Sequence, residues 1–170
     1  MDLKEYIRNI PDFPKKGILF RDITTLLKEP RVFKEVIDQL ANHYKNMEID
    51  KIASVEARGY IFGGALAYLL GCGFVPVRKP GKLPAKTTSL DYALEYGTNT
   101  IEMHTDAITQ GEKVLVFDDL LATGGTVQAT CKLVESLGGT VVGCAFLISL
   151  TELKGIEKLQ KYDVFSLIEY

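Results

Sequence analysis

The stretch from Val114 to Thr126, VLVFDDLLATGGT, places the strongest constraint on how this chain can fold. Its apolar start, VLVF, favours a buried strand, because β-branched and aromatic side chains pack well on a pleated surface. Asp118 and Asp119 are expected directly after that strand, at its carboxyl end. From Val127 onward apolar residues recur at helical spacing until Gly138, where paired glycines are typical of a helix end. The stretch therefore predicts a strand, an acidic pair, a turn and a helix, in that order.

The turn of this motif, TGGT at 123–126, has the composition of an anion site. Glycines let backbone amides approach a ligand closely, threonines add hydroxyl donors, and the amino end of the next helix adds the positive end of its dipole. Asp118 and Asp119 would repel a phosphate, so we expect them to face sugar hydroxyls or a divalent cation. The motif is neither G-x-x-x-x-G-K-[ST] nor G-x-G-x-x-G. It predicts a site for a sugar phosphate; an ordinary capped strand–turn–helix is the alternative.

Length and charge exclude several classes of protein. A chain of 170 residues suits one domain, 1–170, and its net charge of −2 gives no basic footprint for nucleic acid. The chain holds no apolar run long enough to cross a bilayer, and its first residues, MDLKE, lack the apolar core of a signal peptide. We therefore expect a cytoplasmic protein with no nucleic-acid or membrane partner.

The cysteines predict neither a disulfide framework nor a metal site. Cys72, Cys131 and Cys144 are an odd number, widely spaced and set among apolar residues, as expected for reduced core thiols. His43 and His104 do not complete a zinc site with them at any usual spacing.

The rest of the chain alternates between strand and helix patterns. After a short helix at 1–9 and a short strand at 17–19, we expect helices at 31–46, 60–70 and 153–161 and strands at 50–55, 74–77, 140–150 and 164–168. This alternation predicts an α/β fold with a mostly parallel central sheet flanked by helices and with ligands at the carboxyl ends of its strands.

Cations follow two of these strands. Arg58 lies in the turn after the strand at 50–55, where it could clamp a second phosphate group. The loop RKPGKLP at 78–84 carries Arg78, Lys79 and Lys82 without an acidic residue, which suits a strongly anionic ligand such as pyrophosphate. In each case a solvated surface charge is the alternative.

Two further segments suggest covers over such a site. Strand patterns at 90–96 and 100–104 surround a turn at 97–99 and predict a hairpin, either a mobile cover that excludes water or a rigid antiparallel edge. Before them, Phe20 could offer a flat apolar face to a planar ring. Alternatively, Phe20 is part of the core and Arg21-Asp22 is a solvated pair.

Taken together, these pieces resemble the type I phosphoribosyltransferases, and in particular their adenine branch, from about Ile10 to the final strand. The segments that carry the resemblance are PDFPKKGILFRDIT at 11–24, EARGYIFG at 56–63, RKPGKLP at 78–84, LEYG at 94–97 and VFDDLLATGGT at 116–126. The last belongs to the whole superfamily and the others to the adenine branch. Tyr60 and Phe117 stand where relatives often have Phe and Val, and neither change affects a proposed contact.

The resemblance implies a fold and a reaction. The fold is the type I phosphoribosyltransferase fold, with an N-terminal hood at 1–30 and a basic loop and antiparallel flexible hairpin at 79–105. The reaction converts adenine and 5-phospho-α-D-ribose 1-diphosphate (phosphoribosyl pyrophosphate) to AMP and diphosphate in purine salvage, with Mg²⁺, on a homodimer. A transferase for another purine and a non-catalytic regulator that senses phosphoribosyl pyrophosphate are the rival hypotheses.

The resemblance also assigns roles to residues. The turn from Ala122 to Thr126 would hold the 5′-phosphate, the aspartates the ribose hydroxyls, and the cations the pyrophosphate. The hood would meet adenine, with Arg21 contributing mainly backbone polar groups. Mg²⁺ would be held mainly by the substrate, without a protein ligand. The residues implied in substrate binding are Phe20, Arg21, Arg58, Lys79, Lys82, Tyr96, His104, Asp118, Asp119, Ala122, Thr123, Gly124, Gly125 and Thr126. Those implied in catalysis are Arg58, Glu95, Asp118 and Asp119.

Overall fold

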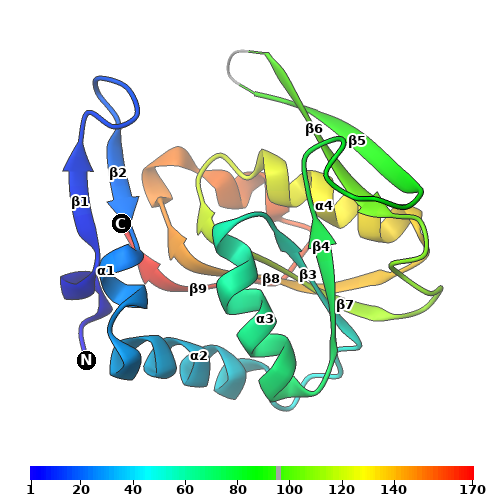
Figure 1. Ribbon diagram of the computed structural model, residues 1–170, viewed down its shortest axis with the longest axis horizontal. Helices are drawn as coiled ribbons and strands as arrows, with labels where there is room; N and C mark the ends of the chain where they lie inside the picture. Colours follow the sequence, from blue (N-terminus) through cyan, green and yellow to red (C-terminus); the bar gives the residue numbers. More distant parts are fainter. Residues whose placement is uncertain (95–96) are drawn as a thin grey trace.

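A central sheet of five strands organises the molecule (Figure 1). The computed structural model describes residues 1–94 and 97–170. The strand order is β4-β3-β7-β8-β9, and every neighbouring pair is parallel. The strands are β3 (Lys51–Val55), β4 (Gly73–Val77), β7 (Lys113–Leu121), β8 (Thr140–Ser149) and β9 (Val164–Glu169). The predicted α/β fold with a parallel central sheet flanked by helices is confirmed.

Helices cover both faces of this sheet. Helices α2 (Pro30–Tyr44) and α3 (Arg58–Leu70) pack on one face, and α4 (Gly125–Ser136) packs on the other (Figure 1). Alternate residues of β7 divide between the two hydrophobic clusters: Leu115 and Phe117 join the cluster with α2 and α3, while Val114 and Val116 join the cluster with α4. The VLVF stretch is therefore buried on both sides, as a central parallel strand requires. In the part of the chain that the structure describes, none of the helices has the length and apolar character that a membrane span needs.

The N-terminal hood is built differently from its sequence pattern. A short 3-10 helix, η1 (Leu3–Tyr6), ends where β1 (Arg8–Pro11) begins, and β1 pairs antiparallel with β2 (Leu19–Asp22) before α1 (Thr24–Leu27). The expected helix at 1–9 is therefore cut short, and the expected strand at 17–19 lies further along the chain. Backbone pairing between segments a dozen residues apart decides both differences, and local periodicity does not report it.

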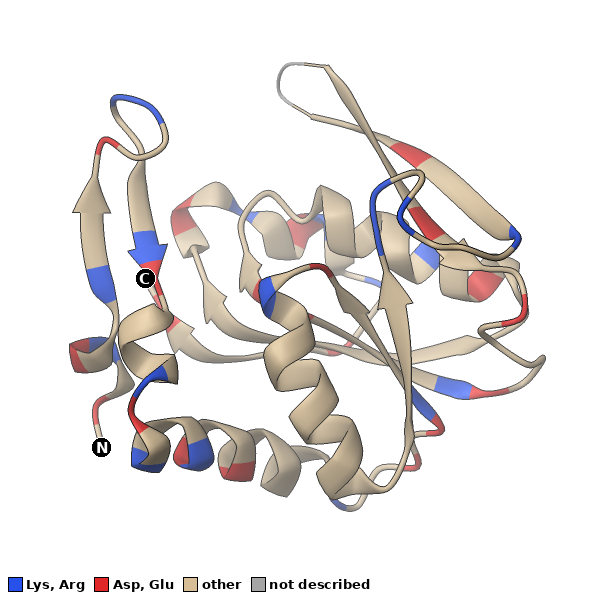
Figure 2. Ribbon diagram, viewed as in Figure 1, with Lys and Arg blue, Asp and Glu red and all other residues tan. Residues whose placement is uncertain are grey.

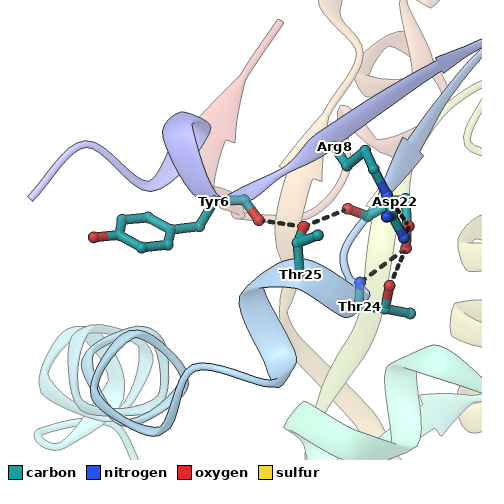
Figure 3. Close-up of polar contacts among 5 residues, drawn as sticks. All are labelled: Tyr6, Arg8, Asp22, Thr24 and Thr25. Atoms are coloured by element: carbon teal, nitrogen blue, oxygen red, sulfur yellow. Dashed lines mark hydrogen bonds and ion pairs between the residues drawn. The ribbon is translucent and has the colours of Figure 1, made fainter.

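Asp22 fastens the parts of the hood to one another (Figure 3). Its carboxylate accepts hydrogen bonds from the Thr24 N–H at 2.9 Å, the Thr24 hydroxyl at 2.7 Å and the Arg8 Nε at 2.9 Å. The Thr25 hydroxyl donates to the Tyr6 carbonyl at 2.6 Å, which ties α1 to η1. This network fixes β2, the strand that carries Phe20.

Substituting Asp22 with asparagine should make the stability less dependent on pH. The bonds from Thr24 and Arg8 lower the pKa of Asp22 from 3.8 to about 2. A lowered pKa stabilises the fold above the unfolded-state pKa, by about 2 kcal/mol, and this gain disappears as the pH falls through about 2. In urea unfolding, Asp22→Asn should therefore lie about 2 kcal/mol below the parent protein at neutral pH and approach it in strong acid. The exposed Asp106→Asn should follow the parent protein, and a gap for Asp22→Asn that stays constant with pH would contradict this role.

The hairpin forms a small sheet of its own. Its strands are β5 (Thr87–Ala93) and β6 (Thr98–His104), which are antiparallel and lie over α4 (Figure 1). A backbone bridge between Arg78 and Glu102 joins β6 to the end of β4. The predicted hairpin is present, but its first strand lies at 87–93 in place of 90–96, and its second strand begins two residues earlier than expected. The residues proposed for the closing hairpin, Glu95 and Tyr96, lie outside the described residues.

After β8 the expected helix at 153–161 is replaced by two 3-10 helices, η2 (Thr151–Leu153) and η3 (Gly155–Leu159). Lys154 separates them with a left-handed φ of 54°, a conformation that interrupts a regular helix. Cys131 and Cys144 are buried as expected, with their sulfur atoms 3.5 Å apart, whereas Cys72 is only half-buried.

Candidate active site

The two aspartates of the central motif lie within β7 and not after it, which corrects the expected strand end. The strand continues to Leu121 because its partner β8 runs beside it along its whole length, with Asp118 paired with Phe146 and Leu121 with Ser149. The local sequence does not indicate that the pairing between β7 and β8 continues beyond the apolar residues of β7. The aspartates are therefore held by the sheet itself, and the Asp118 carboxylate accepts the backbone N–H of Asp119 at 2.9 Å.

A cavity of about 460 Å³ opens at the carboxyl edge of the sheet, a volume typical of small-molecule sites. The ends of β3, β4 and β7, the start of α4 and part of the hairpin all contribute to its walls. Of the residues singled out from the sequence, the cavity is lined by Arg58, Arg78, Lys79, Asp118, Asp119 and Thr126. The cavity lies at the edge of the sheet where the sequence predicts a ligand site.

A second, smaller cavity of about 70 Å³ lies beside the first, within the turn of the motif. We call it the phosphate cup; its walls are Asp118 and residues 120–127. Helix α4 begins at Gly125 without a side-chain cap, and Gly124 has a left-handed φ of 82°. The first amides of a helix have no partner within the helix, so these N–H groups and the helix dipole favour an anion. The cup has room for one compact oxyanion and shares Asp118, Leu120 and Thr126 with the larger cavity.

Arg58 bridges the acidic pair and the hood. Its Nε lies 2.9 Å from Oδ2 of Asp119, and its guanidinium lies 5.1 Å above the ring of Phe20. Burial and the neighbouring charge of Asp119 raise the pKa of Asp118 well above its ordinary value. Burial also raises the pKa of Asp119, and Arg58 opposes that shift. Two carboxyl groups held this close are set to accept hydrogen bonds from hydroxyl groups or to meet a cation.

The basic loop after β4 is anchored by Glu56, a residue that the sequence reasoning missed. Its carboxylate accepts from Nε and Nη2 of Arg78, both at 3.0 Å, and from the Lys79 N–H at 2.7 Å. Burial works against the ionised form, but the bonds from Lys79 and Arg78 lower the pKa of Glu56 overall. Figure 2 shows the Lys and Arg residues gathered in this loop. Arg78 therefore shapes the loop, and both Arg78 and Lys79 line the larger cavity. The signal that could have identified Glu56 in the sequence is its place directly after β3, the same strand end that singled out Arg58.

Tyr92 of the hairpin is a second residue that the sequence did not single out for binding. The Thr126 hydroxyl donates to the Tyr92 hydroxyl at 3.0 Å, and Tyr92 lines the larger cavity. The hairpin is therefore in contact with the phosphate cup.

Other residues named from the sequence lie outside both cavities. The guanidinium of Arg21 is stacked 3.7 Å from the ring of Tyr170, so its side chain is engaged by the C-terminus. Lys82 is exposed, and its carbonyl accepts from Arg78 at 3.3 Å. His104 Nε2 accepts from the Ala85 N–H at 3.3 Å, at the end of the hairpin away from its turn.

The donor set suits a cation shared with a substrate better than a resident metal. Within residues 1–94 and 97–170, no cluster of three or more His, Cys, Asp or Glu side chains could hold a metal ion. Mg²⁺ is often bound through one or two carboxylates together with substrate phosphates and water, and the adjacent Asp118 and Asp119 fit that pattern.

The chain is similar along its length to known phosphoribosyltransferases. The phosphoribosyl transferase domain family matches residues 22–169. An adenine phosphoribosyltransferase from Brachyspira hyodysenteriae is 60% identical over 170 residues, covering 100% of both chains. The crystal structure of an adenine phosphoribosyltransferase from Thermoanaerobacter pseudethanolicus superposes with a TM-score of 0.97 at 56% identity, covering 99% of this chain and 98% of that one. The Saccharomyces cerevisiae enzyme, solved with an imino-altritol bisphosphate and adenine, gives a TM-score of 0.91 at 40% identity over 98% of this chain and 96% of that one. The chain therefore belongs to the phosphoribosyltransferase family, within its adenine phosphoribosyltransferase branch.

Proposed function

We propose that the chain transfers the phosphoribosyl group of phosphoribosyl pyrophosphate to adenine, releasing AMP and pyrophosphate, as a purine salvage enzyme. The observation that carries the proposal is the phosphate cup at the start of α4, directly beside Asp118 and Asp119. An anion site next to paired carboxylates matches a phosphate joined to a ribose. The adenine phosphoribosyltransferases that resemble this chain along its whole length support the choice of base.

The cavity walls suggest how the substrate lies. The 5′-phosphate occupies the cup at 122–126, and the ribose hydroxyls hydrogen-bond to Asp118 and Asp119. The pyrophosphate extends toward Lys79 and Arg58. To contact it, the Arg58 side chain turns away from its partner Asp119. The adenine ring lies at the hood near Phe20, beside the backbone polar groups of Arg21.

The chemistry follows from the movement of charge. As a nitrogen of adenine forms its bond to the anomeric carbon, the bond from that carbon to the pyrophosphate oxygen breaks. Positive charge grows on the sugar, where the aspartates stabilise it, and negative charge grows on the leaving group, where Arg58 and Lys79 stabilise it. Mg²⁺, when bound with the substrate, supplies further neutralisation of the pyrophosphate. In this proposal Glu95 assists proton movement at adenine, and Glu95 and Tyr96 belong to the segment that closes over the reactants.

We also propose that the protein is cytoplasmic and that two copies of the chain form a homodimer. Helix α3 has no charged residue after Arg58 (Figure 2). Its side chains Ile61, Tyr68 and Leu69 are exposed by 42%, 85% and 50%. Helices that are apolar all round are normally covered on every side, so a second copy of the chain is the occupant that we expect.

Turnover with a panel of purines tests the proposed reaction. With saturating phosphoribosyl pyrophosphate and Mg²⁺, we expect AMP from adenine and at least 100-fold lower kcat/KM with guanine, hypoxanthine and xanthine, because a polar base site rejects mismatched groups strongly. Nucleotide formation from guanine but not adenine would contradict the assignment of the base. Binding of phosphoribosyl pyrophosphate without turnover of any purine would favour a sensing regulator.

A further inference from the structure

The segment after β8 packs against the phosphate cup, although about thirty residues separate them in the chain. The Leu150 N–H donates to the Leu121 carbonyl at 2.9 Å, and Gln128 Nε2 donates to the Lys158 carbonyl at 3.0 Å. Leu159, at the end of η3, is fully buried in the cluster that also holds Val127. The segment from Leu150 to Leu159 is therefore bonded to Leu121 at one end of the cup and to Gln128, the residue directly after its other end.

Gly155 meets the cup backbone to backbone. A Cβ placed on Gly155 would lie 2.3 Å from the Ala122 carbonyl oxygen and 2.9 Å from Cδ1 of Leu121. In return, a Cβ placed on Gly124 would lie 2.5 Å from the Gly155 carbonyl oxygen. Backbone atoms cannot yield as the end of a side chain can, so a methyl group at Gly155 has to displace the loop from 122 to 124.

We propose that Gly155 is a positioning residue for the 5′-phosphate, and this inference rests on the proposed function. In this proposal backbone amides bind the phosphate. Their directions are set by the path of the backbone at 122–126 and do not depend on which side chains it carries. The close approach of Gly155 sets that path from the opposite side of the loop. Gly155 does not itself touch the ligand; it fixes the residues that do.

Gly155→Ala tests the proposal. We expect the Kd for ribose 5-phosphate, measured by calorimetry, and the KM for phosphoribosyl pyrophosphate each to rise about tenfold, as expected when one amide to a charged phosphate is misaligned. The KM for adenine should stay unchanged, because the hood does not depend on this contact. Gly143→Ala is the matched control: Gly143 is also buried, but its new Cβ would meet its nearest atoms at 3.4 Å, an ordinary contact.

The outcomes separate this inference from the function on which it rests. If the parent protein binds no ribose 5-phosphate, the proposed phosphate site itself is wrong. If the parent protein binds it and folded Gly155→Ala binds it equally well, or loses only thermal stability, the positioning role is wrong. If Gly155→Ala does not fold, Gln128→Met decides, since it removes only the bond to η3: a Kd about threefold higher supports the role, and an unchanged Kd overturns it.

Discussion

Replacing Asp119 by asparagine should lower kcat/KM for phosphoribosyl pyrophosphate about 100-fold and leave the fold intact. The carboxylate is 7% exposed and faces the cavity, where it would accept charge-assisted hydrogen bonds from ribose and stabilise positive charge on the sugar. Asparagine has the same shape but loses the charge. It also removes the repulsion that helps raise the pKa of Asp118, so the folded state should not lose stability.

The measurement is a pair of assays on the same preparation, steady-state kinetics and thermal unfolding. Asp106→Asn, at an exposed position outside the cavity lining, should match the parent protein in both. If Asp119→Asn loses activity only in proportion to a fall in Tm, the residue is a structural one and the sugar site is misplaced.

Arg58→Gln should have the second large effect, a fall in kcat of about 100-fold. In the free protein Arg58 pairs with Asp119 and lies over Phe20, while about a third of its side chain, 36%, is exposed. An arginine that is partnered but not enclosed can turn toward an arriving pyrophosphate and neutralise the charge that develops as this group leaves. Glutamine keeps much of the length but supplies no charge.

Single-turnover kinetics separate this effect on chemistry from an effect on binding. Arg31→Gln, at an exposed position in the first turn of α2, removes an equal charge outside the cavity lining and should leave the rate unchanged. A variant at Arg58 with normal single-turnover rate and only slower product release would rule out a role in leaving-group stabilisation.

Local sequence patterns predicted the elements whose structure depends on residues close to one another in the chain. The VLVF stretch, helices α2 and α3 and the turn before α4 each carry their own periodicity or glycine signal, and each is found close to its predicted bounds. The pairing of β1 with β2 has no such signal, and neither does the extension of β7 through the aspartates. Both depend on what a distant segment of the chain offers as a partner.

The same division holds for the site. Residues at strand ends were predicted to gather, and Arg58, Lys79 and the acidic pair do line one cavity. Glu56 was overlooked because its role lies in holding Arg78 and Lys79, more than twenty residues away. The contact of Gly155 with Ala122 is a matter of interatomic distance alone, and no sequence pattern of the kind we used reports it.

A crystal of this protein soaked with AMP tests the central claim most directly. We predict the phosphate in the cup formed by residues 120–127, hydrogen-bonded to backbone amides, with the ribose hydroxyls on Asp118 and Asp119 and the base at the hood. AMP bound at another place, with this cup left empty, would contradict the claim.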